Sequence, residues 1–312
     1  MSEPTRRSMR RAVVTAFAVG AMALVAACVP PPTDPGTPTT TPPTTAPNTT
    51  RTVSNATFEW TFNQQVNKVS QAPGQYNYWS AGISDGTAAT YVPTNGNVTV
   101  LKKNAAGTYV PIGSETAVNW TNKGRDGAGN VVTTGNQYFL GQKVRFTNGT
   151  GTVNTATGAS TIQWTGTFTI NFYGSYTPFW IVNPKLTVNA AGVGTLTAAV
   201  GGIGSDIEDP TIRVTLPNRT VTLATIPAVY TGGAIATGFT KAPNFLDQTA
   251  TSTGGVQVPK TSGNAAYWGA FPQSFVSFAD EAGHGPYWFT SGGAADVNKV
   301  PAPISVAYTL NP

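Results

Sequence analysis

The stretch that most constrains the fold is residues 162–172, "IQWTGTFTINF", where the chain alternates with a period of two residues. Each even position, from Ile162 through Trp164 to Phe172, is apolar or glycine, and each odd position is glutamine, threonine or asparagine. Successive side chains of a β-strand point to opposite faces of its sheet, so this pattern is typical of a strand with one buried and one solvated face. The sequence therefore predicts a long strand at 162–172.

Shorter alternating runs recur along the rest of the chain, while helical periodicity is scarce. The best helical candidate is residues 271–278, "FPQSFVSF", and a shorter turn is expected after Glu59. Together these patterns predict an all-β fold, a two-sheet antiparallel β-sandwich-like domain with long loops and at most short helices. The alternating runs are Phe58/Trp60/Phe62, Val98/Val100, Val144/Phe146, Leu186/Val188, Ile212/Val214/Leu216, Val221/Leu223 and Ile304/Val306/Tyr308.

The first residues have the pattern of an export signal. Four arginines between positions 6 and 11 precede a short apolar run at 12–27, and the run ends in Val25-Ala26-Ala27-Cys28, which resembles a bacterial lipobox. A basic start, a short apolar stretch and a small-residue exit predict a signal peptide over 1–27, with the mature chain lipidated at Cys28. The alternative is ordinary cleavage that leaves a free thiol, and the paired arginines leave the export route open between Sec and twin-arginine.

Residues 28–54 are rich in proline and threonine and predict an extended tether. A single β domain is expected over 55–312, and it has no disulfide because Cys28 is the only cysteine. The combination predicts a membrane-anchored lipoprotein on the outer face of the cell membrane. It would contact the membrane through its lipid and hold its domain out into the cell wall.

Charge and motif content argue against several classes of function. Residues 1–27 carry four arginines and one glutamate, so they hold three of the five net positive charges and leave the mature chain at +2. Nucleic-acid binding is therefore not expected. The one histidine, His284, is read as a surface or turn residue, and no metalloprotease, serine-hydrolase or Walker motif is present. The predicted role is binding or structural, not enzymatic.

Two local features allow more than one interpretation. Asp206, Glu208 and Asp209 could hold a calcium ion, although a solvated turn before Pro210 explains them equally well. The segment 170–186, "INFYGSYTPFWIVNPKL", crowds Tyr173, Tyr176 and Trp180 around one glycine. These rings either face a ligand or close the end of the sandwich, since large aromatic side chains mostly serve packing.

Several stretches, taken in order, resemble the HtaA-type domain of actinobacterial cell-surface proteins. They are "FEWTFNQQV" (58–66), "GTGTVNTATGASTIQWTGTFTINFYG" (149–174), "NPKLTVNAAGVGTLTAAV" (183–200), "RTVTLATI" (219–226) and the later part of 267–308. The resemblance implies an all-β two-sheet domain, and it implies haem binding at the cell surface.

The same resemblance places the family's haem ligands on positions that differ here. The ligating tyrosine corresponds to Val69, and the supporting histidine corresponds to Ser175. Valine and serine cannot replace an anionic or imidazole ligand. Tyr76 or Tyr78 is the candidate replacement for the tyrosine, and Tyr173 and Tyr176 flank the missing histidine.

The ligand-binding residues predicted from the sequence are therefore Tyr76, Tyr78, Tyr173, Ser175, Tyr176 and Trp180. The first hypothesis is haem or porphyrin binding with altered ligands. The alternative is an HtaA-like domain without haem that binds envelope glycan or a protein partner. For glycan, the pairs Tyr78-Trp79, Tyr267-Trp268 and Tyr287-Trp288 are predicted to be exposed for stacking on sugar rings.

Overall fold

The computed structural model describes residues 49–69, 76–111, 120–205, 209, 212–230 and 234–311. The predicted signal peptide, Cys28 and most of the predicted tether lie outside these residues, as do Asp206 and Glu208. The first strand begins at Thr50 and pairs from there with a later strand. The folded part thus includes the last five residues that the sequence assigned to the tether.

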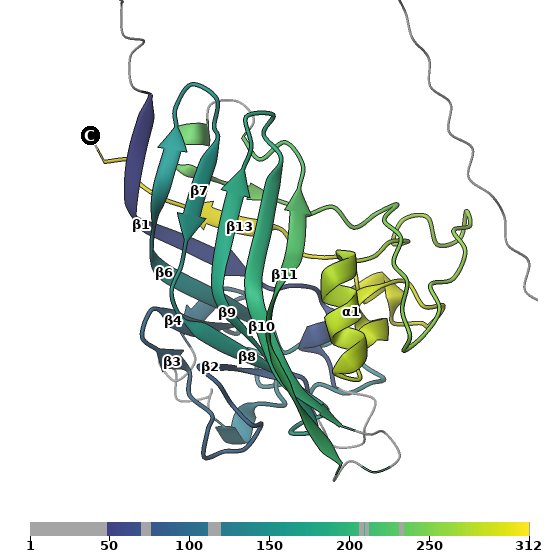
Figure 1. The fold of residues 1–312 in the computed structure, drawn as a ribbon. Coiled ribbons are helices and arrows are strands. Elements are labelled where there is room, and N and C mark those ends of the chain that lie inside the picture. Colours follow the sequence, from purple (N-terminus) through teal and green to yellow (C-terminus); the bar gives the residue numbers. More distant parts are fainter. Residues whose placement is uncertain are drawn as a thin grey trace, which may run out of the picture. The chain divides into compact units, whose positions relative to one another are not determined.

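An antiparallel sheet forms the body of the domain (Figure 1). Its strands follow the order β11-β10-β9-β7-β6-β1-β13-β12. The long strands β10 and β11 pair along most of their length, and the short β13 and β12 finish one edge. The bounds are β1 Thr50–Trp60, β6 Gln142–Asn154, β7 Ser160–Gln163, β9 Thr177–Val188, β10 Gly194–Ser205, β11 Arg213–Ile226, β12 Gly238–Lys241 and β13 Ile304–Ala307.

The sheet branches at β7, which joins β6 to β9 along only part of their length. Beyond β7 the sheet continues as two leaves, one that contains β6 and β4 and one that contains β9 and β8. The first half of β6 pairs with β4 and its second half with β7. Likewise β9 pairs with β8 along its first half and with β7 along its second. The all-β, sandwich-like class is confirmed, with the leaves joined in one branched sheet. The strands that lie off the main order are β2 Tyr78–Ala81, β3 Thr94–Asn95, β4 Val98–Lys103, β5 Tyr109–Pro111 and β8 Thr167–Phe172.

The alternating run at 162–172 is split between β7 and β8. The break falls at Gly166, whose φ of 138° is open only to glycine, and its N–H donates to Asn183 Oδ1 at 2.8 Å. The expectation of a solvated face was wrong for β8, because Thr169 and Asn171 are fully buried. The segment after β2 covers that face, where Ser84 N–H donates to Thr169 Oγ1 at 3.0 Å.

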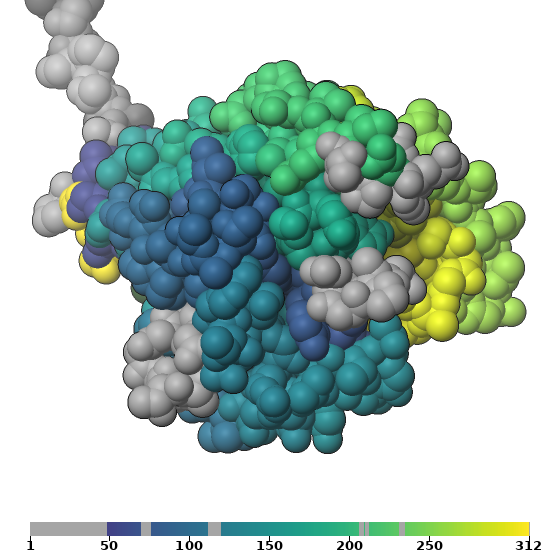
Figure 2. All heavy atoms as spheres, turned by 90° about the horizontal axis from the view of Figure 1, so that it is seen from below, coloured from purple at the N-terminus to yellow at the C-terminus, as the bar shows by residue number. Residues whose placement is uncertain are grey.

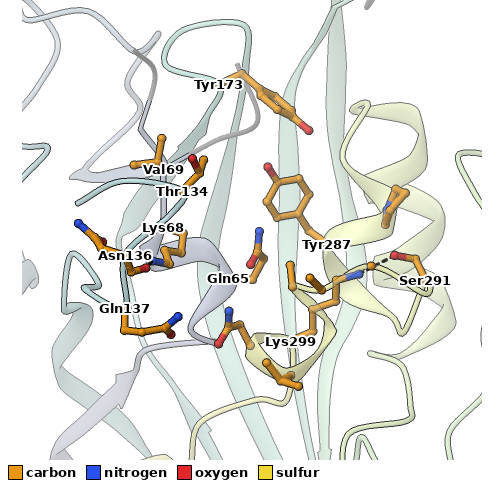
Figure 3. Close-up of a pocket in the computed structure, with 16 residues that line it drawn as sticks. Gln65, Lys68, Val69, Thr134, Asn136, Gln137, Tyr173, Tyr287, Ser291 and Lys299 are labelled. Carbon is orange, nitrogen blue, oxygen red and sulfur yellow. Dashed lines mark hydrogen bonds between the residues drawn. The ribbon is translucent and has the colours of Figure 1, made fainter. Parts of the chain in front are cut away.

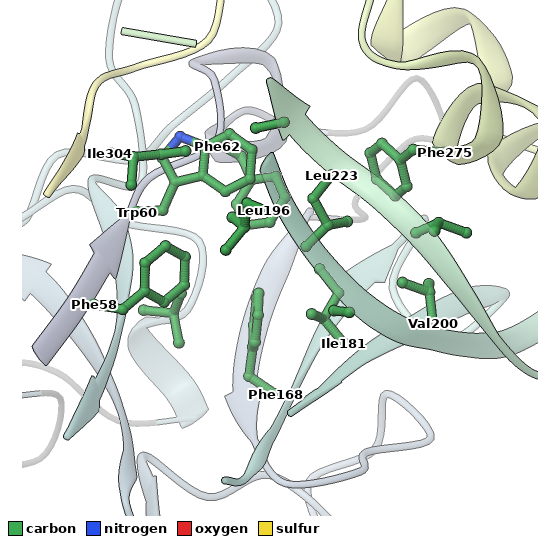
Figure 4. Close-up of a cluster of buried hydrophobic side chains, with 14 of the residues drawn as sticks. Phe58, Trp60, Phe62, Phe168, Ile181, Leu196, Val200, Leu223, Phe275 and Ile304 are labelled. Carbon is green, nitrogen blue, oxygen red and sulfur yellow. The ribbon is translucent and has the colours of Figure 1, made fainter. Parts of the chain in front are cut away.

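One apolar cluster fills the interior between the leaves (Figure 4). Phe58 and Trp60 of β1 lie in it together with Phe168 of β8, and Leu196 joins from β10. Trp164 is anchored by its indole N–H, which donates to Ala56 O at 2.9 Å. Burying rings of this size gives a domain without disulfides its main stabilisation.

Helices are short, as the sequence predicted. The helix expected at 271–278 is α1, Gln273–Glu281, which buries Phe275, Val276 and Phe278 and lies beside β11 (Figure 1). No helix among the described residues is long and apolar enough to span a membrane. The other helical segments in the described part of the chain are 3-10 turns: η1 Gln65–Asn67, η2 Trp120–Asn122, η3 Ala234–Ala236, η4 Gly285–Trp288 and η5 Asp296–Asn298.

Candidate functional site

A cavity of about 550 Å³ opens between three parts of the chain that are distant in sequence (Figure 3). Residues after β1, the loop at 134–137 and the C-terminal segment 286–299 form its walls, and Tyr173 from the end of β8 completes it. The same segments meet on one face of the domain in Figure 2, in dark blue, teal and yellow. Its volume falls in the range of pockets that hold small molecules, which is about 300–1,000 Å³.

Two tyrosines form one side of this cavity. The rings of Tyr173 and Tyr287 lie 5.9 Å apart at 87°, and their hydroxyl groups point toward each other (Figure 3). Burial raises the pKa of Tyr173, and the neighbouring side chain of Tyr287 partly offsets that rise. Tyr173 also has a φ of 52°, a left-handed conformation that costs a non-glycine residue about 1–2 kcal/mol. Backbone strain of this kind is concentrated at functional sites.

On the opposite side of the cavity, Lys68 contacts the loop at 133–136. Its ammonium donates to the carbonyl oxygen of Thr133 at 3.2 Å and to that of Asn136, and it lies 4.9 Å from the centre of the Phe139 ring. The amide of Asn136 shapes the same loop, because its Oδ1 accepts from the backbone N–H groups of Thr133 and Tyr138, each at 3.2 Å. The loop that forms this wall is therefore held in place by hydrogen bonds to the side chains of Lys68 and Asn136.

A buried ion pair stabilises the segment 286–299, which forms the third wall of the cavity. Lys299 Nζ lies 2.6 Å from Asp296 Oδ1, and the two side chains are 6% and 3% exposed. The same ammonium donates to Phe289 O at 2.9 Å and to Ser291 Oγ at 2.8 Å. Asp296 accepts from the N–H groups of Ser291 and Gly292 at 3.1 and 2.7 Å. Burial lowers the pKa of Lys299, and Asp296 opposes that shift.

The charged side chains that line the cavity are two lysines, of which Lys299 is ion-paired with Asp296. Lys68 and Lys299 line it, and the described residues that line it include no aspartate or glutamate. The remaining polar contribution comes from amides and hydroxyls, among them Gln65, Asn136 and Asn298. Apolar lining comes from Val69, Pro286, Ala294, Ala295, Val297 and the two tyrosine rings. A site of this kind suits a ligand that has both a flat apolar part and polar or anionic groups.

Of the six ligand-binding residues predicted from the sequence, Tyr173 is the one that lines this cavity. Tyr76 forms an isolated β-bridge with Val69, a lining residue, but its ring packs on Gly124. A Cβ added at Gly124 would lie 2.4 Å from Tyr76 Cζ. Tyr78 is 2% exposed and donates its hydroxyl to Gly86 O, and burial raises its pKa. Both tyrosines therefore serve packing in this structure.

The turn after β8 separates the other predicted residues. Ser175 accepts from Arg213 Nη2 through its backbone oxygen at 2.8 Å, and Tyr176 is 39% exposed. Trp180 lies over the glycine at position 201 and donates its indole N–H to Asn218 Oδ1 at 2.8 Å. The aromatic residues of 170–186 thus lie in three different places: Phe172 and Phe179 in the core, Tyr173 at the cavity and Tyr176 at the surface.

The predicted exposure of the aromatic pairs was wrong for two of the three. Both rings of Tyr78-Trp79 and of Tyr287-Trp288 are buried, with Trp79 and Trp288 at 0% exposure. These pairs fill the interior because they lie on β2 and η4, which pack against the core. Tyr267 and Trp268 are half-buried, and Trp268 donates its indole N–H to Val258 O at 2.6 Å.

His284 was interpreted as a surface or turn residue; it lies in a turn, where its carbonyl oxygen accepts from Tyr287 N–H at 3.2 Å, but the expected exposure was wrong. Its side chain is fully buried between the rings of Phe172 and Phe179, whose centres lie 4.7 and 4.8 Å from that of the imidazole. Nδ1 accepts from Trp288 Nε1 at 3.0 Å. Burial lowers the pKa of His284 to about 3, so the ring is neutral at neutral pH. It behaves as a core aromatic residue.

Sequence reasoning missed Lys68 and Lys299, because a single lysine beside a loop has no distinctive pattern. It named Tyr287 only as half of a presumed exposed pair. Within the part of the chain that the structure describes, no group of three or more histidine, cysteine, aspartate or glutamate residues is placed to hold a metal ion.

Comparisons with known proteins place the chain in no family. No protein-family model matches the chain, and no curated protein matches it. Among solved structures, the crystal structure of the C-terminal domain of HtaA from Corynebacterium glutamicum is 13% identical, with a TM-score of 0.34. The match covers 84% of this chain and 99% of that one. A match at this TM-score and identity assigns this chain neither a family nor a ligand.

Proposed function

We propose that this chain is an exported, lipid-anchored protein whose β domain binds a haem or related tetrapyrrole in the cavity beside Tyr173. The observation that carries the proposal is that Tyr173 places a phenol at a cavity of about 550 Å³ whose walls hold Lys68 and several apolar side chains. The role is one of binding, and the export signal and the lipid at Cys28 put it on the outer face of the cell membrane.

The residues present fit a tetrapyrrole with altered ligation. Val69 lines the cavity but offers no donor atom, and Ser175 does not line it, so neither supplies a ligand. Tyr173 would hold the iron through its phenolic oxygen, as tyrosine does in some haem proteins. A ferric haem supplies an iron centre that favours an anionic oxygen. Because burial raises the pKa of Tyr173, the phenol keeps its proton until such a cation displaces it.

A haemin titration of the purified protein, followed at the Soret band, tests this proposal. The wild-type protein is expected to give a saturable, shifted band, and Tyr173→Phe to lose it because the ligand atom is gone. Tyr176→Phe is the matched control, since Tyr176 lies in the same turn, is exposed and does not line the cavity. Equal bands from the wild type and Tyr173→Phe would contradict Tyr173 as the ligand. A band like that of haemin in buffer would reject haem binding.

A second candidate is an envelope glycan in the same cavity. The observation that favours it is the presence of several amide side chains in the lining, namely Gln65, Gln137 and Asn298. Amide groups hydrogen-bond to the hydroxyl groups of sugars, and aromatic rings stack on sugar rings. Retention of the wild-type protein on insoluble cell-wall glycan, lost in Tyr287→Ala and kept in Tyr176→Ala, is the expected result for this function.

A further inference from the structure

The two lysines of the cavity differ in how their charge is balanced. Lys299 forms an ion pair with Asp296 and donates to two further oxygens, so its three N–H groups are used within the protein. Lys68 is 8% exposed and contacts two carbonyl oxygens and the face of Phe139. Within the described residues, no carboxylate forms an ion pair with it.

Lys68 therefore keeps one N–H donor without an acceptor, and a positive charge without a carboxylate partner, among the described residues at the cavity wall. An ammonium group has three N–H donors, and Lys68 uses two of them on Thr133 and Asn136. Nearly buried charges are normally paired, since an unpaired one costs free energy. The lining around Lys68 contains no acidic side chain among the described residues, so the protein itself supplies no anion there.

We propose that Lys68 binds a carboxylate group of the ligand that occupies this cavity, so that acids are selected over their neutral counterparts. The inference rests on the proposed function, because it assumes that the cavity is the ligand site. Lys68 lies on the wall across from Tyr287 (Figure 3), so a ligand that meets the two tyrosines at one side presents its carboxylate at the other. A tetrapyrrole propionate and a uronic-acid sugar both supply this group.

A purely structural role for Lys68 predicts something different. In that case the lysine only fixes the turn at 133–136, and its removal weakens all ligands to the same degree. Recognition of a carboxylate predicts a loss confined to acids, while the neutral forms of the same ligands bind as before. Lys68→Arg keeps a cation and its donors, whereas Lys68→Met removes both and keeps most of the apolar stem.

The test measures affinities for two matched pairs of probes. The first pair is haemin and its dimethyl ester, and the second is a uronic-acid oligosaccharide and its carboxyl-reduced form. For the pair that binds, the wild-type protein is expected to prefer the acid by about ten- to a hundredfold, as for a charge-assisted hydrogen bond in a partly buried site. Lys68→Met should reduce that preference to about threefold or less, and Lys68→Arg should keep most of it. Lys185→Met, an exposed lysine outside the cavity, is the control for loss of charge.

The outcomes separate the two proposals. Equal binding of acid and neutral forms by the wild type, or a preference that survives Lys68→Met, overturns the carboxylate site while leaving the cavity as the ligand site. Failure of both pairs to bind overturns the proposed function and this inference together. If Lys68→Met does not fold, as judged by circular dichroism, Lys68→Gln, which removes the charge and keeps N–H donors, takes its place, and a preference that survives Lys68→Gln overturns the carboxylate site.

Discussion

His284 makes the stability of the domain depend on pH in a way that can be calculated. The imidazole is fully buried against Phe172 and Phe179, and its pKa falls to about 3 from an ordinary value of about 6.5. Because Nδ1 accepts from Trp288, the neutral ring carries its proton on Nε2, which has no hydrogen-bond partner among the described residues. Protonation in the folded state would place an unpaired charge in the core.

The sign and size of the effect follow from linkage. Between about pH 6.5 and about pH 3 the unfolded chain binds a proton at this position and the folded chain does not, so acidification favours unfolding. The stabilisation is fully present above the unfolded pKa and is lost as the pH falls. From about pH 7 to about pH 5, one such histidine lowers the free energy of unfolding by about 2 kcal/mol.

Urea unfolding at a series of pH values measures this loss. The wild-type protein should lose about 2 kcal/mol over that range, and His284→Phe should lose much less. The variant is also expected to be less stable at pH 7, because the indole N–H of Trp288 loses its acceptor. His284→Gln, which offers a non-titrating acceptor, is the second variant. Equal pH slopes in the wild type and both variants would refute the neutral, buried state of His284.

Two further predictions concern stability. Lys299→Met should lower the free energy of unfolding by about 3–5 kcal/mol, because it leaves the carboxylate of Asp296 buried without its partner; urea unfolding measures it, and a loss below about 1 kcal/mol would show that the pair is dispensable. Gly151→Ala should cost more than about 2 kcal/mol, since its Cβ would lie 1.9 Å from Thr161 O across the β6–β7 pair. Gly135→Ala, where an added Cβ meets nothing within 4 Å, is the control and should change the melting temperature little.

The architecture was predictable because it depends on side-chain periodicity. The alternating runs at 144–146 and 186–188 lie in strands, and the run at 58–62 does so as far as Trp60, where β1 ends. Most of the apolar run at 271–278 lies in α1. The prediction was wrong where tertiary packing overrides a local pattern. Thr169 and Asn171 look solvated in sequence, yet the segment after β2 covers them. A polar residue on an alternating strand says nothing about what later folds over it.

The candidate site was much less predictable, because its walls come from segments far apart in the chain. Tyr173 was named from the aromatic crowd around Gly174, and the fold does place it at the cavity. Tyr287 joins it from more than a hundred residues away, and no local pattern links the two. Exposure was misjudged for Tyr78 and His284, since residue type alone does not distinguish a surface ring from a core ring.

The most direct test of the central claim is a crystal structure of the protein grown with haemin. We expect a tetrapyrrole in the cavity, with its iron at coordination distance from the phenolic oxygen of Tyr173 and a propionate at the ammonium of Lys68. A tetrapyrrole bound elsewhere on the domain, or a cavity without one in crystals that contain haemin, would contradict the claim that this cavity is the haem site.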